Sequence, residues 1–125
     1  DGGSAQAQVL AQQAALEQAR AAYQNTVLTA LKEVEDALVA QAQDALRLQQ
    51  LQDAASAAEL AALLAKHRYA SGLIDFQTVL QTQRTLLGAQ DSAASAQADL
   101  SADRVRLIKA LGGGWSAHAT ETEPL

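Results

Sequence analysis

Side chains of the kinds that perform catalysis are few in this chain, and their spacing does not assemble them into a site. Glu33, Glu35 and Asp36 form an acidic run, and paired carboxylates are able to act as general acid and base. A solvated helix face explains the run better, because a two-helix hairpin forms no pocket around it. Serine, histidine and aspartate residues occur, but nothing in their order indicates a catalytic triad. The sequence therefore predicts no enzymatic step.

Metal-binding residues are equally scattered. The histidines, His67 and His118, lie far apart, and cysteine is absent. Structural and catalytic metal sites need His, Cys, Asp or Glu side chains at close spacing. We therefore expect no metal ion and no cofactor. The absence of cysteine excludes disulfides but does not identify the compartment.

The densest group of distinctive side chains is residues 68–80, Arg-Tyr-Ala-Ser-Gly-Leu-Ile-Asp-Phe-Gln-Thr-Val-Leu. Gly72 fits the left-handed position that closes a helix, with Ser71 as the C-cap. Asp75 fits the N-cap of a following helix. We therefore expect a tight turn over about residues 71–74, where the chain reverses direction.

Two apolar residues of this turn have different expected surroundings. Ile74 precedes the N-cap and would pack on Val79 as a hydrophobic staple. Leu73 has only the stems of His67 and Arg68 to cover it. An exposed leucine at a loop tip suggests a binding partner, although singly exposed leucines are common. Turn formation and partner contact both stay open as roles for this segment.

Long helical patterns flank the turn, so the expected fold class is all-α, a long antiparallel coiled-coil hairpin. Alanine is abundant and the single proline is Pro124, so nothing interrupts a helix. The first helix is expected over about residues 4–70, with Ser4 as its N-cap, and the second over about 75–111. The polar residues 116–125 lack periodicity and are expected to be disordered.

Apolar residues recur at heptad-like intervals in both helices. The expected seam of the first helix is Val27, Leu31, Val34, Leu38, Ala45 and Leu48, resumed by Leu60, Leu63 and Leu64. Its opposite face carries Lys32, Glu33, Asp36 and Asp44. The expected seam of the second helix is Val79, Leu86, Ala93, Leu100 and Leu107. Gly88, inside the second helix, suggests a close approach by a neighbouring helix.

The predicted helices differ in length. Roughly 45 Å of the first helix extends beyond the second when both start at the turn. That part carries Val9, Leu10, Leu16, Tyr23, Val27 and Leu28. We therefore expect the chain to belong to a larger assembly or to oligomerise. The net charge of −5 and the absence of a basic run argue against nucleic-acid binding.

Around the turn, the sequence has the pattern Arg68-Tyr69-x-x-Gly72-Leu-x-Asp75-x-x-x-Val79-Leu80-x-x-Gln83-Arg84-x-Leu86-Leu87-x-Ala89-Gln90. This pattern resembles the second helical hairpin of TolC-like outer-membrane efflux proteins. Residues 23–38 resemble the long descending helix of that family, and residues 107–115 resemble the end of its lipoprotein subgroup. The opening Asp-Gly-Gly resembles the point where a barrel strand enters the helix. The resemblance covers about residues 1–115.

The resemblance implies a homotrimer that forms an outer-membrane barrel and a periplasmic helical tunnel. This segment would lie in the periplasm, and the barrel strands and first hairpin would come from other parts of the parent protein. A periplasmic adaptor (membrane fusion) protein would link the tunnel tip to an inner-membrane pump. Drugs, metal ions or other toxic solutes would leave through the tunnel. The expected adaptor contacts are Arg68, Gly72, Leu73 and Asp75.

The resemblance also implies a gate, with Tyr69, Thr78 and Gln81 as the candidate residues. The positions of the family's gating carboxylates correspond here to Thr78 and Gln81, which are uncharged. A hydrogen bond from Tyr69 to either would be weaker than a charged one. Asp75 could supply a charge, although its capping role already explains it. The alternative is a structural coiled-coil hairpin or scaffold without a transport role, and the sequence does not identify an exported solute.

Overall fold

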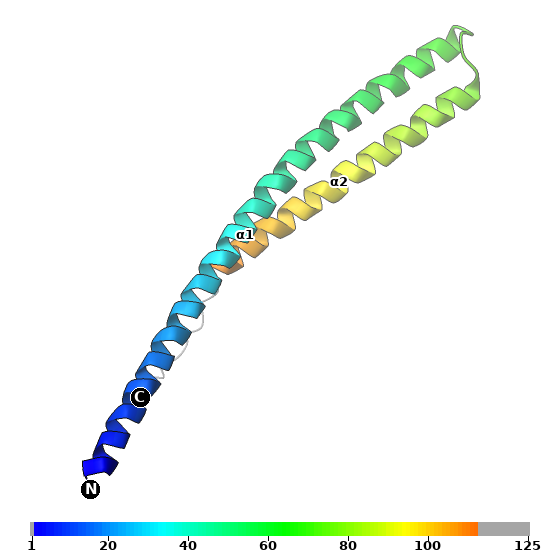
Figure 1. Ribbon diagram of the computed structural model, residues 1–125. Helices are drawn as coiled ribbons and strands as arrows, with labels where there is room; N and C mark the ends of the chain where they lie inside the picture. The colour runs from blue at the N-terminus through cyan, green and yellow to red at the C-terminus, as the bar shows by residue number, and fades with distance from the viewer. Residues whose placement is uncertain (1, 113–125) are drawn as a thin grey trace, which may run out of the picture. The chain divides into compact units, whose positions relative to one another are not determined.

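The computed structural model describes residues 2–112, which form two helices and no strand (Figure 1). α1 spans Gly2–Ala70 and α2 spans Phe76–Gly112. The predicted all-α hairpin is confirmed. Residues 116–125, for which we expected a disordered tail, lie outside the described residues.

The predicted N-cap at Ser4 is wrong, because α1 already includes Gly2 and Gly3. Each glycine costs up to about 1 kcal/mol in a helix relative to alanine. Extending an existing helix needs no new nucleation, so the alanine- and glutamine-rich segment that follows can propagate the helix through both glycines.

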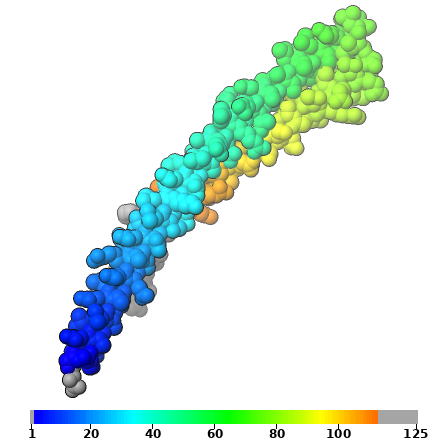
Figure 2. Space-filling view, viewed as in Figure 1, coloured from blue at the N-terminus to red at the C-terminus, as the bar shows by residue number. Residues whose placement is uncertain are grey.

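The chain divides into two units, Asp1–Asp36 and Ala37–Leu125. The first unit is a stretch of α1 alone. The second contains the rest of α1, the turn and α2, and it is the hairpin. Within the hairpin the two helices lie side by side and in contact (Figure 2). No helix in residues 2–112 is both long enough and apolar enough to cross a bilayer.

The helices of the hairpin pack along a narrow seam that is rich in alanine. Its buried and half-buried positions advance by alternating steps of three and four, which is heptad spacing. In α1 they are Ala37, Gln41, Asp44, Leu48, Leu51, Ala55, Ala58, Ala62 and Ala65, with half-buried Ala40 beside them. In α2 they are Val79, Thr82, Leu86, Ala89, Ala93, Ala96, Leu100, Asp103, Leu107 and Ala110, with half-buried Gln83 beside Thr82. Leu48, Ala96 and Leu100 form its core cluster, with Leu51 packed against them.

The seam expected for α2 is confirmed at all of its predicted positions, whereas most of the α1 expectation is wrong. Beside α2, the exposed positions among those predicted for α1 are Leu38, Ala45, Leu60, Leu63 and Leu64. Val27 and Leu31 are also exposed, but they lie in the part of α1 that was expected to extend beyond α2. Asp44, expected on the charged face, is half-buried in the seam instead. The physical reason is that α1 carries two apolar stripes, and the stripe of small residues faces α2. Gly88 has no atom within 4 Å of the position of an added Cβ, so no neighbour within the described chain requires this glycine.

Large apolar side chains are exposed along the first unit. They are Val9, Leu10, Leu16, Tyr23, Val27, Leu28 and Leu31. Exposed apolar surface of this extent is typical of a protein interaction site. It supports the expectation that this part of α1 is covered by other polypeptide.

Replacing Leu48 by alanine tests the position of the seam. Leu48 is only 8% exposed in the core cluster, so Leu48→Ala should lower the free energy of unfolding by about 2 kcal/mol or more. Leu38→Ala, at a side chain 50% exposed, is the matched control and should change it by less than about 0.5 kcal/mol. Urea unfolding followed by circular dichroism, at concentrations where the chain is monomeric, measures both. Equal losses would contradict the assignment.

Candidate functional site: the hairpin tip

α1 ends in a left-handed turn at Gly72, whose φ is +74°. The N–H of Gly72 donates to the carbonyl of Tyr69 at 2.9 Å, and the N–H of Leu73 donates to the carbonyl of Arg68 at 2.8 Å. These two bonds are the Schellman arrangement, which satisfies carbonyls that the end of a helix leaves open. The glycine predicted to close α1 is therefore confirmed.

α2 begins with a side-chain cap from Asp75. Its Oδ1 accepts a hydrogen bond from the backbone N–H of Thr78 at 3.0 Å and another from the Thr78 hydroxyl at 2.6 Å. The hydroxyl bond first, and then the backbone bond, lower the pKa of Asp75 below its ordinary value of 3.8. The predicted N-cap is confirmed, and the carboxylate is held in place by its own helix.

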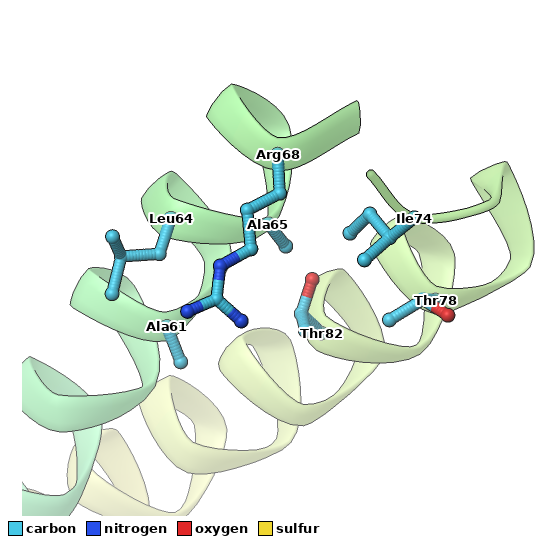
Figure 3. A pocket seen from close by; sticks show the side chains of 7 residues that line it. All are labelled: Ala61, Leu64, Ala65, Arg68, Ile74, Thr78 and Thr82. Atoms are coloured by element: carbon cyan, nitrogen blue, oxygen red, sulfur yellow. The ribbon is translucent and has the colours of Figure 1, made fainter. Parts of the chain in front are cut away.

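Ile74 is half-buried and Val79 is buried. Figure 3 shows the Ile74 side chain directed across the turn toward Ala65 of α1. The burial of both residues is compatible with the expected Ile74–Val79 staple, which stays a prediction.

A shallow groove of about 210 Å³ lies between the two helices next to the turn (Figure 3). It is lined by Ala61, Leu64, Ala65, Arg68, Ile74, Thr78 and Thr82. The Arg68 side chain extends along it, with its guanidinium near Ala61 and Thr82 in the view of Figure 3. Small side chains on both helices leave the hollow open, and the arginine supplies positive charge beside it.

The tip exposes an apolar cluster. Leu73 is 73% exposed, more than any other large apolar side chain of the described residues. In a Schellman turn the residue at this position usually packs on the residue five before it, which here is Arg68 and does not cover it. Tyr69 and Phe76 pack on each other with ring centroids 5.5 Å apart and planes tilted by 54°. Both rings remain about half exposed.

Phe76 is the tip residue that sequence reasoning missed. An aromatic residue directly after an N-cap lies close to the end of the preceding helix whenever the turn is this short. The spacing of seven residues between Tyr69 and Phe76 across the glycine was the available signal.

The candidate gate residues do not bond to one another within the hairpin. The hydroxyl of Thr78 donates to Asp75, and Tyr69 packs on Phe76. Gln81 is exposed on α2. A gate formed by these residues between protomers stays a prediction.

The acidic run Glu33–Asp36 is exposed apart from Val34. Within residues 2–112, no group of three or more His, Cys, Asp or Glu side chains is placed to hold a metal ion.

Gly72→Ala tests the backbone requirement of the turn. A side chain at positive φ costs about 1–2 kcal/mol, so this variant should lower the free energy of unfolding by that amount. Gly88→Ala is the matched control and should have the opposite effect. Its site is open and helical, so alanine should raise the free energy of unfolding by up to about 1 kcal/mol. Urea unfolding measures both. Destabilisation of equal size at both glycines would contradict the turn assignment.

Asp75→Asn tests the charge on the cap. Because the folded-state pKa of Asp75 is lowered, its ionised form contributes stability above the ordinary pKa of 3.8, and that stability is lost as pH falls through the folded-state value. Asparagine still caps a helix but does not titrate. The melting temperature of the parent chain should therefore exceed that of the variant at neutral pH, and the difference should shrink in acid. A difference that is independent of pH would refute the charged cap.

Comparison with known proteins agrees with the helical-hairpin geometry. Residues 1–113 match the family "Outer membrane efflux protein". The pyoverdine export outer membrane protein OpmQ of Pseudomonas putida is 43% identical over 97 residues, which are 77% of this chain and 20% of the relative. The toluene efflux pump outer membrane protein TtgF of the same species is 37% identical over 95 residues, 76% of this chain and 20% of the relative.

The solvent efflux pump outer membrane protein SrpC, also of Pseudomonas putida, is 35% identical over 96 residues, 77% of this chain and 20% of the relative. The chain thus spans about a fifth of the length of these curated relatives. No solved structure matches it significantly. With a family match over residues 1–113 and the predicted hairpin present, the chain belongs to the outer membrane efflux protein family.

Proposed function

We propose that this chain is a helical-hairpin segment of an outer-membrane channel that exports solutes from the periplasm to the exterior. The observation that carries the proposal is the tip, where a doubly capped turn presents uncovered apolar side chains. Membership of the outer membrane efflux protein family supports it. The channel would provide a passage and perform no chemical step.

In our proposal, this segment does not determine which solute the channel exports. Relatives whose printed names refer to pyoverdine, toluene and solvents share it at 35–43% identity. A segment retained across such different solutes is suited to forming the passage and its contacts. Drugs, metal ions and other toxic compounds all stay candidates.

The assembly that we propose is a homotrimer in the outer membrane, with this hairpin in the periplasm. Its support is the second apolar stripe of α1. Leu38, Leu60, Leu63 and Leu64 are 48–59% exposed although the hairpin seam runs beside them. Burial of apolar surface contributes about 25 cal/mol per Å², so neighbouring helices would gain stability by covering this stripe.

The partner proposed at the tip is a periplasmic adaptor protein, which would connect the channel to an inner-membrane pump. Leu73 offers the apolar contact, Arg68 and Asp75 flank it with opposite charges, and Gly72 holds the turn that presents it. Binding by a pre-formed turn costs less conformational entropy than ordering a flexible loop. Apolar side chains with a charged rim are typical of protein interfaces.

The gate that we propose is formed by Tyr69, Thr78 and Gln81 of adjacent protomers. Its hydrogen bonds would be uncharged, since Thr78 and Gln81 carry no carboxylate. Asp75 accepts two hydrogen bonds from Thr78, so its role as the cap of α2 already accounts for its carboxylate. Closure would then depend only weakly on salt.

A cysteine at Leu73 in the full-length parent tests adaptor contact. The 125 residues contain no cysteine, so a photoactivatable crosslinker attached there reports on this one position of the segment. We expect crosslinks to the adaptor protein when the pump is active. Gln90→Cys, exposed on α2 away from the tip, is the control and should give none.

Export by the same cells separates the two parts of the proposal. Leu73→Asp should reduce solute export while the channel still reaches the outer membrane. Normal export without a Leu73 crosslink would refute the tip as the docking point but leave the channel function standing. Unchanged export after deletion of the whole parent gene would refute the channel function.

A further inference from the structure

Two aspartates occupy the seam at the end of the hairpin away from the tip. Asp103 of α2 is 4% exposed and is the one charged side chain that is buried among the described residues. Asp44 of α1 is half-buried. Both lie at heptad positions of their helices, in the layer next to the Leu48–Ala96–Leu100 cluster. Two aspartates thus occupy seam positions where a coiled coil normally places apolar side chains.

The charged neighbours of this pair satisfy only one oxygen of Asp103. Arg106 Nη1 donates a hydrogen bond to Asp103 Oδ1 at 3.5 Å, and the Arg106 side chain is 65% exposed. Arg47 lies on α1 close to the pair, but its Nη1 is bonded to Asp99 Oδ2 at 3.3 Å. Asp103 Oδ2 is buried and has no hydrogen-bond partner among the described residues. A buried carboxylate oxygen without a donor is strongly unfavourable.

Protonation of one of the two carboxyl groups removes this unfavourable arrangement. Once one carboxyl of the pair is protonated, it becomes a donor and the other becomes an acceptor. The hydrogen bond with Asp44 is the largest cause of the raised pKa of Asp103. Burial of Asp103 is the second cause that raises this pKa, and the negative charge of Asp44 is the third. Asp99 raises the pKa by a smaller amount, whereas the positive charge of Arg106 lowers it. Two carboxyls that share a site behave in this way because both cannot ionise cheaply.

We propose that Asp44 and Asp103 share one proton and form a pH-sensitive clasp between α1 and α2. The clasp lies about eight helical turns from the tip, at 3.6 residues per turn. With the proton, a hydrogen bond from the protonated carboxyl to the remaining carboxylate joins the helices, and the pair carries one negative charge. Without it, two negative charges oppose each other in an apolar seam, and this end of the hairpin loosens. The proposal does not depend on the transport function proposed above.

The direction of the pH dependence follows from the folded-state pKa. Because that of Asp103 is raised above the ordinary value of 3.8, the folded chain holds more protons than the unfolded chain between the two values. Stability from the clasp is therefore full in acid and falls as pH rises through the folded-state pKa. The capping carboxylate at the tip has the opposite dependence, so the two ends of the hairpin respond to pH in opposite directions.

Spin labels on the 125-residue chain test the clasp. One pair, on cysteines replacing Gln43 and Ser101, reports the separation of the helices near the clasp. A second pair, replacing Lys66 and Gln81, reports the separation near the tip. All four positions are exposed. As pH rises from acidic to neutral, pulsed electron resonance should show a broader and longer distance distribution near the clasp and an unchanged one near the tip.

Isosteric variants test whether the pH response comes from the proton on Asp103. Asp103→Asn supplies amide donors to Asp44 at every pH, so the distance near the clasp should stay short and the melting temperature at neutral pH should rise. Asp91→Asn removes the same charge from an exposed site on α2 and should leave the pH response of the parent intact. Carbon-13 spectra of the aspartate carboxyls should also show Asp103 titrating above the ordinary range.

Three results would each overturn the clasp. They are distances near the clasp that do not change with pH, a pH response in Asp103→Asn as large as in the parent, and an ordinary titration of the Asp103 carboxyl in the helical chain. The carboxyl titration does not require a variant, so it decides the matter even if a substitution prevents folding.

Discussion

The packing of α1 against α2 through small side chains is the constraint on which the rest of the hairpin depends. An alanine-rich seam lets two helices approach closely, but each alanine removes little apolar surface from water. Apart from Leu48 and Leu51, the leucines of α1 therefore lie outside the seam and remain exposed. For the same reason, a polar side chain inside the seam has a large effect on stability. The seam is narrow, and few apolar contacts compensate for a buried charge such as that of Asp103.

The tip is organised independently of that seam. Its order comes from local hydrogen bonds, which close α1 at Gly72 and open α2 at Asp75 within a few residues of each other. Every one of these bonds spans five residues or fewer along the chain. Leu73 can therefore be displayed to solvent without destabilising the helices on either side. A surface that is held by hydrogen bonds and left uncovered is a suitable docking point in the channel that we propose.

Prediction from sequence succeeded for the turn and the helix caps, whose chemistry is local. It failed in α1, where either of two apolar stripes could have been the one that faces α2. Gly72 and Asp75 are identifiable because only certain residues suit a left-handed turn or an N-cap. In α2 one apolar stripe repeats every seven residues, so Val79 and Leu100 were placed correctly. In α1 the leucines suggested the wrong stripe, since hydrophobicity does not reveal which partner each stripe meets. The Tyr69–Phe76 contact was missed because it depends on how the chain crosses the turn.

The sequence by itself determined the helical class, the position and geometry of the turn, and the family, because these depend on local propensity, capping and motif. Only the tertiary structure decided that alanines of α1 face α2, that Tyr69 packs on Phe76, and that Asp44 and Asp103 share the seam. These contacts join residues far apart in the chain, and their existence depends on the rotation of each helix about its axis. Along the chain, Asp103 looks like any aspartate of a solvated face; packing against α1 is what buries it.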